Sequence, residues 1–334
     1  MSVNKALLFF WGLGLIFFLP VWAQAPVPSG DPVKRFVFHE QVLDAAFQLE
    51  VYSAQAGAAQ KLATDIWQEL KLQVPLLAEP ALEKLEKAAQ LEPVVVSEPL
   101  FNFLKALLNY HRLSQGALDP TSQPLYALWG FVPGSFNYHL PGTADWEKIK
   151  PLLDASALKL MESPFRLQIS KKNLRLNLRP GLQGFLIDRA VPLLKKSGLV
   201  AALSTREVGY YQGVPPGAQA WKVAMPHPQM PGRVFSYLYV KDQALARISV
   251  LSNTFTYGGL NYHDLLDART GQPTEQGLAL SITRPNALAA ELSAHLLIRL
   301  TSAEIQKVLP ELEQTHALKL VSQNSLLIPL EYSH

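Results

Sequence analysis

Two five-residue segments alternate apolar and polar side chains and stand on either side of a polar turn. They are residues 165–169 (FRLQI) and 174–178 (LRLNL), with residues 170–173 (SKKN) between them. A period of two predicts strands buried on one face, and the turn predicts an antiparallel hairpin. Helical segments occur before and after this hairpin. We therefore expect an α+β fold with mostly antiparallel sheets rather than a doubly wound parallel sheet.

The other expected elements follow from the spacing of apolar residues. Residues 99–113 carry one apolar stripe at helical spacing, and Pro99 suits a first helical turn. Helices are expected at residues 56–72, 99–113, 145–153, 185–196, 286–300 and 303–308. Strands are expected at residues 36–38, 47–52, 200–203, 221–224, 234–240, 247–251, 278–283, 318–321 and 325–328.

Composition and charge exclude several classes of protein. The chain has 334 residues, of which 49% are hydrophobic, so it can bury a large core. Lys and Arg total 30 against 27 for Asp and Glu, a net charge of only +3, so we expect no nucleic-acid partner. The absence of cysteine excludes disulfides, thiolate metal sites, thiol nucleophiles and a lipid-anchored N-terminal cysteine.

The N-terminus resembles an export signal. Lys5 precedes an uncharged apolar run at residues 6–23, and Val21 and Ala23 fit the positions before a cleavage site. We expect residues 1–23 to be a signal peptide, residues 24–31 a linker and residues 32–334 the folded domain, exported to the periplasm. The alternative is an uncleaved segment that anchors the chain in the inner membrane.

Three segments resemble one protein family. Residues 114–121 (SQGALDPT) and 124–131 (PLYALWGF) resemble the SGGAFDPTVGPLVELWGF segment of the bacterial FAD:protein FMN transferases, the ApbE family. Residues 265–271 (LLDARTG) resemble that family's ILDPRTG, and residues 184–190 (GFLIDRA) its GYAVDRA. The three matches stand in the family's order at roughly the family's intervals.

The resemblance implies a reaction and a set of ligands. Family members use FAD and a divalent cation, usually magnesium, to attach FMN to a Thr or Ser of a flavin-acceptor protein. The implied cofactor-binding residues are Asp119, Thr121, Trp129, Arg179, Ser252, Asp267, Thr270 and Gly271. Asp119 and Thr121 are equally suited to start a helix, and Trp129 to fill a core. These structural roles are compatible with a place near a flavin pocket.

The segments that would bind diphosphate and metal depart most from the family. At residues 177–184 (NLRPGLQG) a glycine pair is replaced by Arg179 and Pro180, and the Arg179 guanidinium could supply a positive charge for phosphate. The metal ligands implied by the resemblance are the Leu182 backbone carbonyl, Glu291 and His295. Residues i and i+4 share a helix face, and histidine favours zinc or another transition metal over magnesium. The alternative is a solvated Glu–His pair on a surface helix.

Two candidates remain for the catalytic base. Asp264 occupies the position of a family histidine and His263 precedes it, so either could accept the proton of an attacking hydroxyl. A displaced loop without a catalytic role is the alternative. For the whole chain, three interpretations stand: a divergent flavin transferase, a catalytically inactive exported homologue that binds a flavin or a partner, or an unrelated α+β binding module. The first two require a cavity that admits a flavin, and a compact hydrophobic plug between the Trp129 and Thr270 segments without such a cavity would contradict both.

Overall fold

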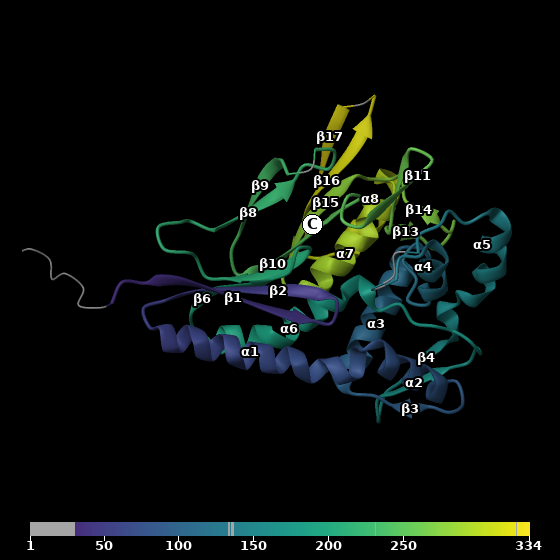
Figure 1. Cartoon of the computed structure of the whole chain (residues 1–334), viewed down its shortest axis with the longest axis horizontal. Coiled ribbons are helices and arrows are strands. Elements are labelled where there is room, and N and C mark those ends of the chain that lie inside the picture. The colour runs from purple at the N-terminus through teal and green to yellow at the C-terminus, as the bar shows by residue number, and fades with distance from the viewer. Residues whose placement is uncertain (1–30, 133, 135–136, 231, 325) are drawn as a thin grey trace, which may run out of the picture. The chain divides into compact units, whose positions relative to one another are not determined.

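The computed structural model describes residues 31–334 except 133, 135–136, 231 and 325 (Figure 1). Residues Val33–His334 form one unit. The predicted signal peptide and nearly all of the predicted linker lie outside the described residues. Within the described part, no helix combines the length and apolar character needed to cross a membrane.

An antiparallel sheet of eight strands organises the unit, in the order β1-β2-β6-β7-β10-β15-β16-β17. Strands close in sequence are neighbours at both edges, while the central strands β7, β10 and β15 come from distant parts of the chain. The strands are β1 (Lys34–Val42), β2 (Ala45–Ser53), β6 (Val200–Ser204), β7 (Val208–Gln212), β10 (Gln243–Ser249), β15 (Ala279–Arg284), β16 (His316–Gln323) and β17 (Leu326–Ser333).

One face of this sheet is covered by three helices, α1 (Ala56–Leu77), α6 (Arg179–Ser197) and α7 (Ala287–Arg299) (Figure 1). Alternation along the strands explains the two faces. In β10, Ala244 and Ala246 are buried in the main core, which the helices share, whereas Leu245 belongs to a separate cluster. α7 is buried on all sides, as expected for the central helix of such a layer.

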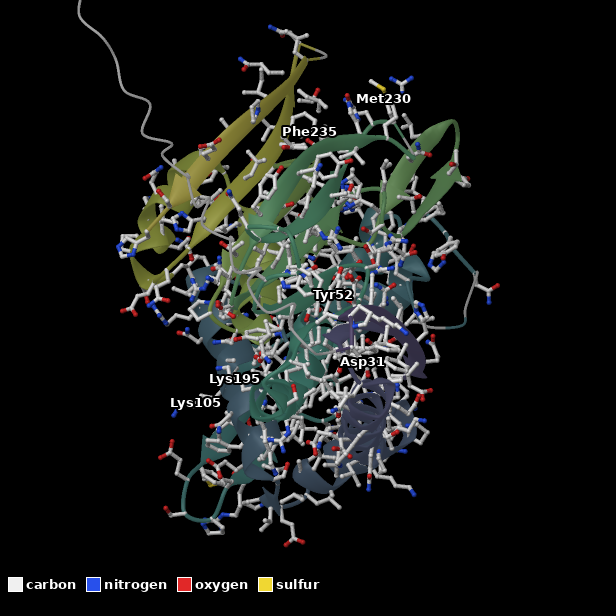
Figure 2. The ribbon with its side chains drawn as sticks, turned by 90° about the vertical axis from the view of Figure 1, so that its left-hand side faces the viewer. Asp31, Tyr52, Lys105, Lys195, Met230 and Phe235 are labelled. Atoms are coloured by element: carbon white, nitrogen blue, oxygen red, sulfur yellow. The ribbon has the colours of Figure 1, made fainter. Side chains whose placement is uncertain are left out.

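The separate cluster is covered by a hairpin of β8 (Trp221–Pro226) and β9 (Val234–Val240). Trp221 packs edge-on against Tyr52 of β2, with ring centroids 5.8 Å apart. Figure 2 labels Tyr52 in the sheet, and Met230 and Phe235 in the hairpin. The hairpin therefore stabilises the sheet from the side that the helices leave open.

The remaining elements surround the helical layer. α3 (Glu98–Leu113) packs on α7, and a small sheet of order β3-β5-β4 lies beside α2. These and the other elements are α2 (Glu79–Ala89), β3 (Val94–Val95), α4 (Gln123–Trp129), α5 (Thr143–Ile149), β4 (Leu158–Met161), β5 (Arg166–Ile169), β11 (Thr254–Tyr257), β12 (Leu260–His263), β13 (Leu266–Asp267), β14 (Gln272–Pro273), α8 (Ser302–Val308) and the 3-10 turns Lys150–Leu152, Ala155–Ala157 and Leu309–Glu311.

The α+β prediction is confirmed, but the predicted hairpin at residues 165–178 is wrong. β5 pairs with β4 and β3 instead, and residues 174–178 form no strand. Their alternation has another cause: three leucines enter the core, while the Glu86 carboxylate accepts the N–H of Leu176 and the Pro120 carbonyl accepts that of Asn177. The Glu86 side chain and the Pro120 backbone thus take the hydrogen bonds that a neighbouring strand would otherwise accept.

Candidate functional site

The site is built on the close contact between α6 and α7. A Cβ on Gly184 would lie 2.4 Å from the Ala287 carbonyl oxygen, so only glycine allows this approach. Asp188, on the next turn of α6, accepts the backbone N–H groups of Ala287 and Leu288 at 2.7 and 2.9 Å. The start of α7 is therefore fixed against α6, and its later turns face the first residues of α6.

A polar cavity of about 230 Å³ opens beside these helices. It brings together segments that are far apart in the sequence: the start of α6, the β6–β7 turn, the end of β10 and the turn after β12. Four of its charged or polar lining residues were predicted site residues, namely Arg179, Ser252, Asp264 and His295, and Leu182 also lines it. Three further charged residues of this cavity, Asp44, Arg206 and Glu207, were not predicted site residues.

Glu291 lies in the protein interior next to this cavity. Its Oε2 accepts the N–H of Gly184 at 2.5 Å, and its Oε1 has no hydrogen-bond partner. Burial, with a smaller contribution from the nearby Glu207, raises the pKa of Glu291 to about 8. Each ligand atom of Glu207, Glu291 and His295 lies within 4.8 Å of the others. The sequence pointed to two of these three residues and missed Glu207.

His295 is 9% exposed and Glu291 only 1%. The alternative of a solvated pair on a surface helix is therefore wrong. Burial, and then the neighbouring Arg299, lower the pKa of His295 well below its usual value, so the imidazole is neutral at pH 7. Arg299 Nη1 lies 3.3 Å from His295 Nδ1 and donates to the His295 carbonyl at 2.6 Å. This contact orients the other ring nitrogen away from Arg299.

The two candidate bases occupy different environments. Asp264 lines the cavity and accepts a hydrogen bond from Asn253 Nδ2 at 2.9 Å, and burial raises its pKa. His263 is absent from the cavity lining. Its Nδ1 is buried without a partner, and burial lowers its pKa to about 4. Of the two, Asp264 has the geometry of a base for a ligand in the cavity.

Arg179 reaches the cavity from an irregular first turn of α6. Pro180 and Gly181 depart from helical geometry, and Gly181 has a φ of 93°. The Arg179 guanidinium donates to the Phe131 carbonyl at 2.8 Å and lies 6.0 Å from the centre of the Tyr126 ring. The side chain is thus fixed at the cavity wall with several N–H groups left for a ligand.

Trp129 and Gly271 lie outside the cavity lining. Trp129 is fully buried and donates its indole N–H to the Gly271 carbonyl at 2.9 Å, and a Cβ on Gly271 would lie 2.6 Å from the Trp146 ring. An aromatic cluster therefore fills the space between the two motif segments, so the hydrophobic plug that speaks against a flavin at this place is present. It contains Leu125, Tyr126, Trp129, Phe131, Trp146 and Leu266, with Tyr138, Phe255 and Tyr262 packed against it.

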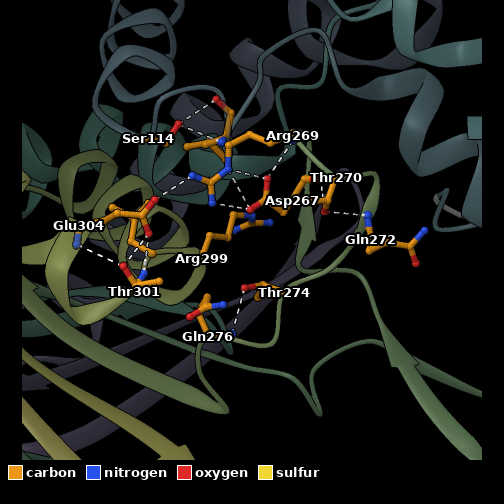
Figure 3. Close-up of polar contacts among 12 residues, drawn as sticks. Ser114, Asp267, Arg269, Thr270, Gln272, Thr274, Gln276, Arg299, Thr301 and Glu304 are labelled. Atoms are coloured by element: carbon orange, nitrogen blue, oxygen red, sulfur yellow. Dashed lines mark hydrogen bonds and ion pairs between the residues drawn. The ribbon is translucent and has the colours of Figure 1, made fainter. Parts of the chain in front are cut away.

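Asp267 and Thr270 belong to a network of polar contacts (Figure 3). Asp267 forms an ion pair with Arg269 at 2.6 Å and also accepts its backbone N–H at 2.9 Å, while Arg269 reaches Glu304 at 3.0 Å. Thr270 is exposed and bonds within the same turn. These bonds shape the turn, and neither residue lines the polar cavity.

Asp119 and Thr121 are also satisfied inside the protein. Asp119 Oδ1 accepts both the N–H and the hydroxyl of Thr121, at 2.7 and 2.5 Å, and Thr121 Oγ1 accepts the N–H of Asp154 at 2.8 Å. The pair organises the chain before α4 and contributes no atom to the cavity lining. The structural role weighed for this segment is thus present.

A second, mainly apolar cavity of about 420 Å³ adjoins the polar one. Asp44, Arg179 and Leu182 line both. The remaining apolar lining comes from the β1–β2 turn, the α1–α2 junction and the segment before α6, including Leu43, Leu77, Leu82, Leu176 and Leu178. The sequence did not predict this cavity, because its walls come from segments that are far apart in the chain.

The same arrangement of sheet and helices occurs in solved flavin transferases. The ApbE protein of Thermotoga maritima matches with a TM-score of 0.76 at 20% identity, over 90% of this chain and 97% of that one. The flavin transferase ApbE of Vibrio cholerae matches with a TM-score of 0.75 at 19% identity, over 90% and 97% of the two chains. The fold is that of the flavin transferases.

The ApbE family model matches residues 43–319, and the chain belongs to the ApbE family. An FAD:protein FMN transferase of Salmonella typhimurium is 24% identical over 294 residues, which cover 84% of this chain and 82% of the relative. One from Treponema pallidum is 25% identical over 289 residues, with 78% of each chain covered. The family resemblance inferred from the motifs is confirmed.

Proposed function

We propose that this protein is a divergent FAD:protein FMN transferase whose reaction takes place in the polar cavity. The observation that carries the proposal is the convergence of Arg179, Asp264 and His295, from three separate segments, on one cavity. Relatives with 24% and 25% sequence identity to this chain are FAD:protein FMN transferases. An FAD-binding protein needs room for a charged diphosphate next to room for an aromatic ring, and the two adjoining cavities offer both.

The proposed binding mode follows from the linings. The diphosphate would lie in the polar cavity near Arg179 and Arg206, since guanidinium groups bind phosphate oxygens well. The isoalloxazine ring would lie in the apolar cavity among leucine side chains. The aromatic cluster at Trp129 leaves no such place for it. With volumes of about 230 and 420 Å³, the two cavities together reach the size of ordinary ligand sites, roughly 300–1,000 Å³.

The proposed reaction needs one bond to form and one to break. The hydroxyl oxygen of the acceptor Thr or Ser bonds to the phosphorus of the FMN half, and the bond from that phosphorus to the AMP half breaks. The hydroxyl proton passes to Asp264, whose raised pKa makes its carboxylate a better base near neutral pH. Arg179 holds the diphosphate in line during the transfer.

A divalent cation is part of the proposal. It would neutralise charge on the diphosphate. Glu291 has one buried carboxylate oxygen without a partner, and His295 and Glu207 are close by, so the residues present fit a cation. The Leu182 carbonyl is the further oxygen ligand that the family resemblance implies.

The test is transfer itself. The protein is incubated with FAD, a divalent metal and a flavin-acceptor domain, and covalent flavin fluorescence is read on a denaturing gel. Labelled acceptor supports the proposal. FAD binding without labelling, under Mg²⁺, Mn²⁺ and Zn²⁺ in turn, contradicts it.

That second result would favour an inactive homologue that binds a flavin or a partner. One observation supports this candidate: Arg179 and Arg206 already donate to the Phe131 and Ser252 carbonyls, at 2.8 and 2.5 Å, and Arg179 replaces a family glycine. Side chains fixed in this way narrow the space for a moving phosphoryl group. Equilibrium FAD binding combined with the gel separates the two candidates.

We also propose that the chain is exported and acts in the periplasm. The support is the basic start and apolar run at residues 1–23. Cell fractionation, together with N-terminal sequencing of the purified protein, tests this. A first residue at position 24 supports cleavage, and the full chain in the membrane fraction supports an anchor.

A further inference from the structure

We propose that Glu207, Glu291 and His295 form a transition-metal site that binds Zn²⁺ more tightly than Mg²⁺. The inference concerns the cavity of the proposed function and names its third ligand. It can fail or succeed independently of FMN transfer, because metal binding is measurable without FAD.

The first argument is geometric. The ligand atoms of the three residues lie within 4.8 Å of one another. Zinc binds carboxylate oxygen and imidazole nitrogen at roughly 2.0–2.2 Å, so two ligands on one ion lie about 3–4 Å apart. Small side-chain rotations therefore suffice to bring the three ligand atoms to coordination distance from one ion.

The second argument is an unpaired buried atom. Glu291 is 1% exposed, its Oε2 is occupied by Gly184, and its Oε1 has no hydrogen-bond partner. A buried carboxylate oxygen without a partner is costly unless a cation or a proton occupies it. In the described part of the chain, no lysine or arginine forms an ion pair with Glu207, Glu291 or Asp264. Arg179 and Arg206 line the same cavity, but an ion bound by the three residues would contact Glu291 Oε1 directly.

The third argument is that the ligands are fixed before an ion arrives. Glu291 and His295 are one helical turn apart on the buried helix α7. Glu207 lies in the β6–β7 turn, where Thr205 Oγ1 accepts the N–H groups of Glu207 and Val208 at 3.2 and 3.1 Å. Rigid supports of this kind lower the cost of ordering the ligands.

The donor set determines the metal. Magnesium prefers oxygen ligands and retains several waters, whereas imidazole nitrogen suits zinc, copper, iron and nickel. His295 is neutral and so has a lone pair to offer. Coordination through Nε2 puts the proton on Nδ1, and the contact to Arg299 Nη1 at 3.3 Å must then lengthen. Arg299 keeps its bonds to the carbonyls of His295 and Leu266, at 2.6 and 2.8 Å.

The experiment measures metal binding directly. The full chain is freed of metal by a chelator and titrated with ZnCl2, MnCl2 and MgCl2 by calorimetry, and Co²⁺ absorption reports the ligand set. We expect Zn²⁺ to bind with 1:1 stoichiometry, at least about 10-fold more tightly than Mg²⁺ and more tightly than Mn²⁺. Equal affinity for Mg²⁺, or no saturable binding of any of the three ions, overturns the proposal.

Two variants assign the ligands. Glu207→Gln and His295→Gln should each weaken Zn²⁺ binding by more than about 10-fold. Loss of a residue that only supports a metal ligand already lowers metal affinity by about 10-fold or more, so loss of a ligand itself should exceed that value. The exposed Glu147→Gln and His39→Gln serve as controls for nonspecific binding. Circular dichroism checks that both variants fold. Glu207 lies in a half-buried turn, so Glu207→Gln should disturb folding less than His295→Gln on the buried helix α7. Wild-type Zn²⁺ affinity in both folded variants contradicts the site.

Discussion

Trp129 and Gly271, 142 residues apart, are joined by a hydrogen bond of 2.9 Å from the indole N–H to the backbone carbonyl. The bond ties together the two segments in which the sequence most resembles the ApbE family. The ring of Trp146 packs on Gly271 from another side. The two segments therefore pack against each other, and the cavity that we assign to FAD lies beside them.

Gly271→Ala should destabilise the protein strongly. Its Cβ would lie 2.6 Å from the Trp146 ring, and the residue has a φ of 74°. Overpacking costs about 1–3 kcal/mol and a left-handed conformation about 1–2 kcal/mol more. Gly217→Ala is the matched control, because its φ is 76° with open space around it. Urea unfolding should show a clearly larger loss for Gly271→Ala, and equal losses would mean that the contact with Trp146 is unimportant.

Asp267→Asn should weaken folding and leave FAD binding intact. The change removes an ion pair with Arg269, so the free energy of unfolding should fall by about 1–3 kcal/mol. Asp267 does not line either proposed FAD cavity. Urea unfolding and FAD titration by fluorescence check the two halves of this prediction. A large loss of FAD affinity in the folded variant would restore the cofactor-binding role that the motif implied.

Asp264→Asn should abolish transfer while FAD still binds. An amide cannot accept the hydroxyl proton, and loss of a general base typically lowers a rate by about 10²–10⁴-fold. The initial rate of acceptor labelling is the measurement, and the surface variant Asp65→Asn is the control. A wild-type rate for Asp264→Asn would exclude it as the base.

Arg179→Gln should weaken ligands that carry a diphosphate. A charge-assisted hydrogen bond contributes about 1.5–3 kcal/mol, which is roughly 10- to 150-fold in affinity. FAD and ADP should both lose affinity, whereas riboflavin, which has no phosphate, should bind as before. The exposed Arg233→Gln is the control. Equal weakening of riboflavin would show that Arg179 shapes the cavity and does not bind phosphate.

His263 should make the protein sensitive to acid. Its pKa is about 4 in the folded protein and 6.5 as a free side chain, so the unfolded chain binds more protons between these values. Stability therefore rises with pH from about 4 to 6.5 and is lost as the pH falls through that range. His263→Gln should reduce this slope, and His39→Gln should not. Unfolding free energies at several pH values test this, and an unchanged slope in His263→Gln contradicts it.

Sequence periodicity predicted the fold class and many of the elements, because burial on one face leaves a repeating pattern. The helix expected at residues 99–113 is α3 at Glu98–Leu113, and the one at residues 286–300 is α7. Periodicity could not distinguish a strand from an extended segment. The leucines of residues 174–178 alternate as a strand would, and the partners of their backbone are Glu86 and Pro120, distant in sequence. It also missed α2 and α4.

Motif resemblance predicted the family and part of the cavity. Asp264, Arg179 and His295 were found because each stands at or next to a family position. Glu207 was missed because it lies outside the segments that resemble the family, and an acidic residue gives no signal by itself. Only the fold brings the β6–β7 turn next to α7. The sequence could not show whether Asp119 and Asp267 bind a ligand or stabilise the fold, because that distinction depends on their hydrogen-bond partners in the structure.

The contact of Gly184 and Asp188 with the first turn of α7 makes the two helices a single block. Arg179 and Leu182 stand on one half of that block, and Glu291 and His295 on the other. A substitution that loosens the contact of Gly184 or Asp188 with α7 would move both halves of the pocket apart at once. Thermal stability and ligand affinity should therefore decline together in variants at this helix contact. Only substitutions elsewhere in the protein can change one of these two properties without changing the other.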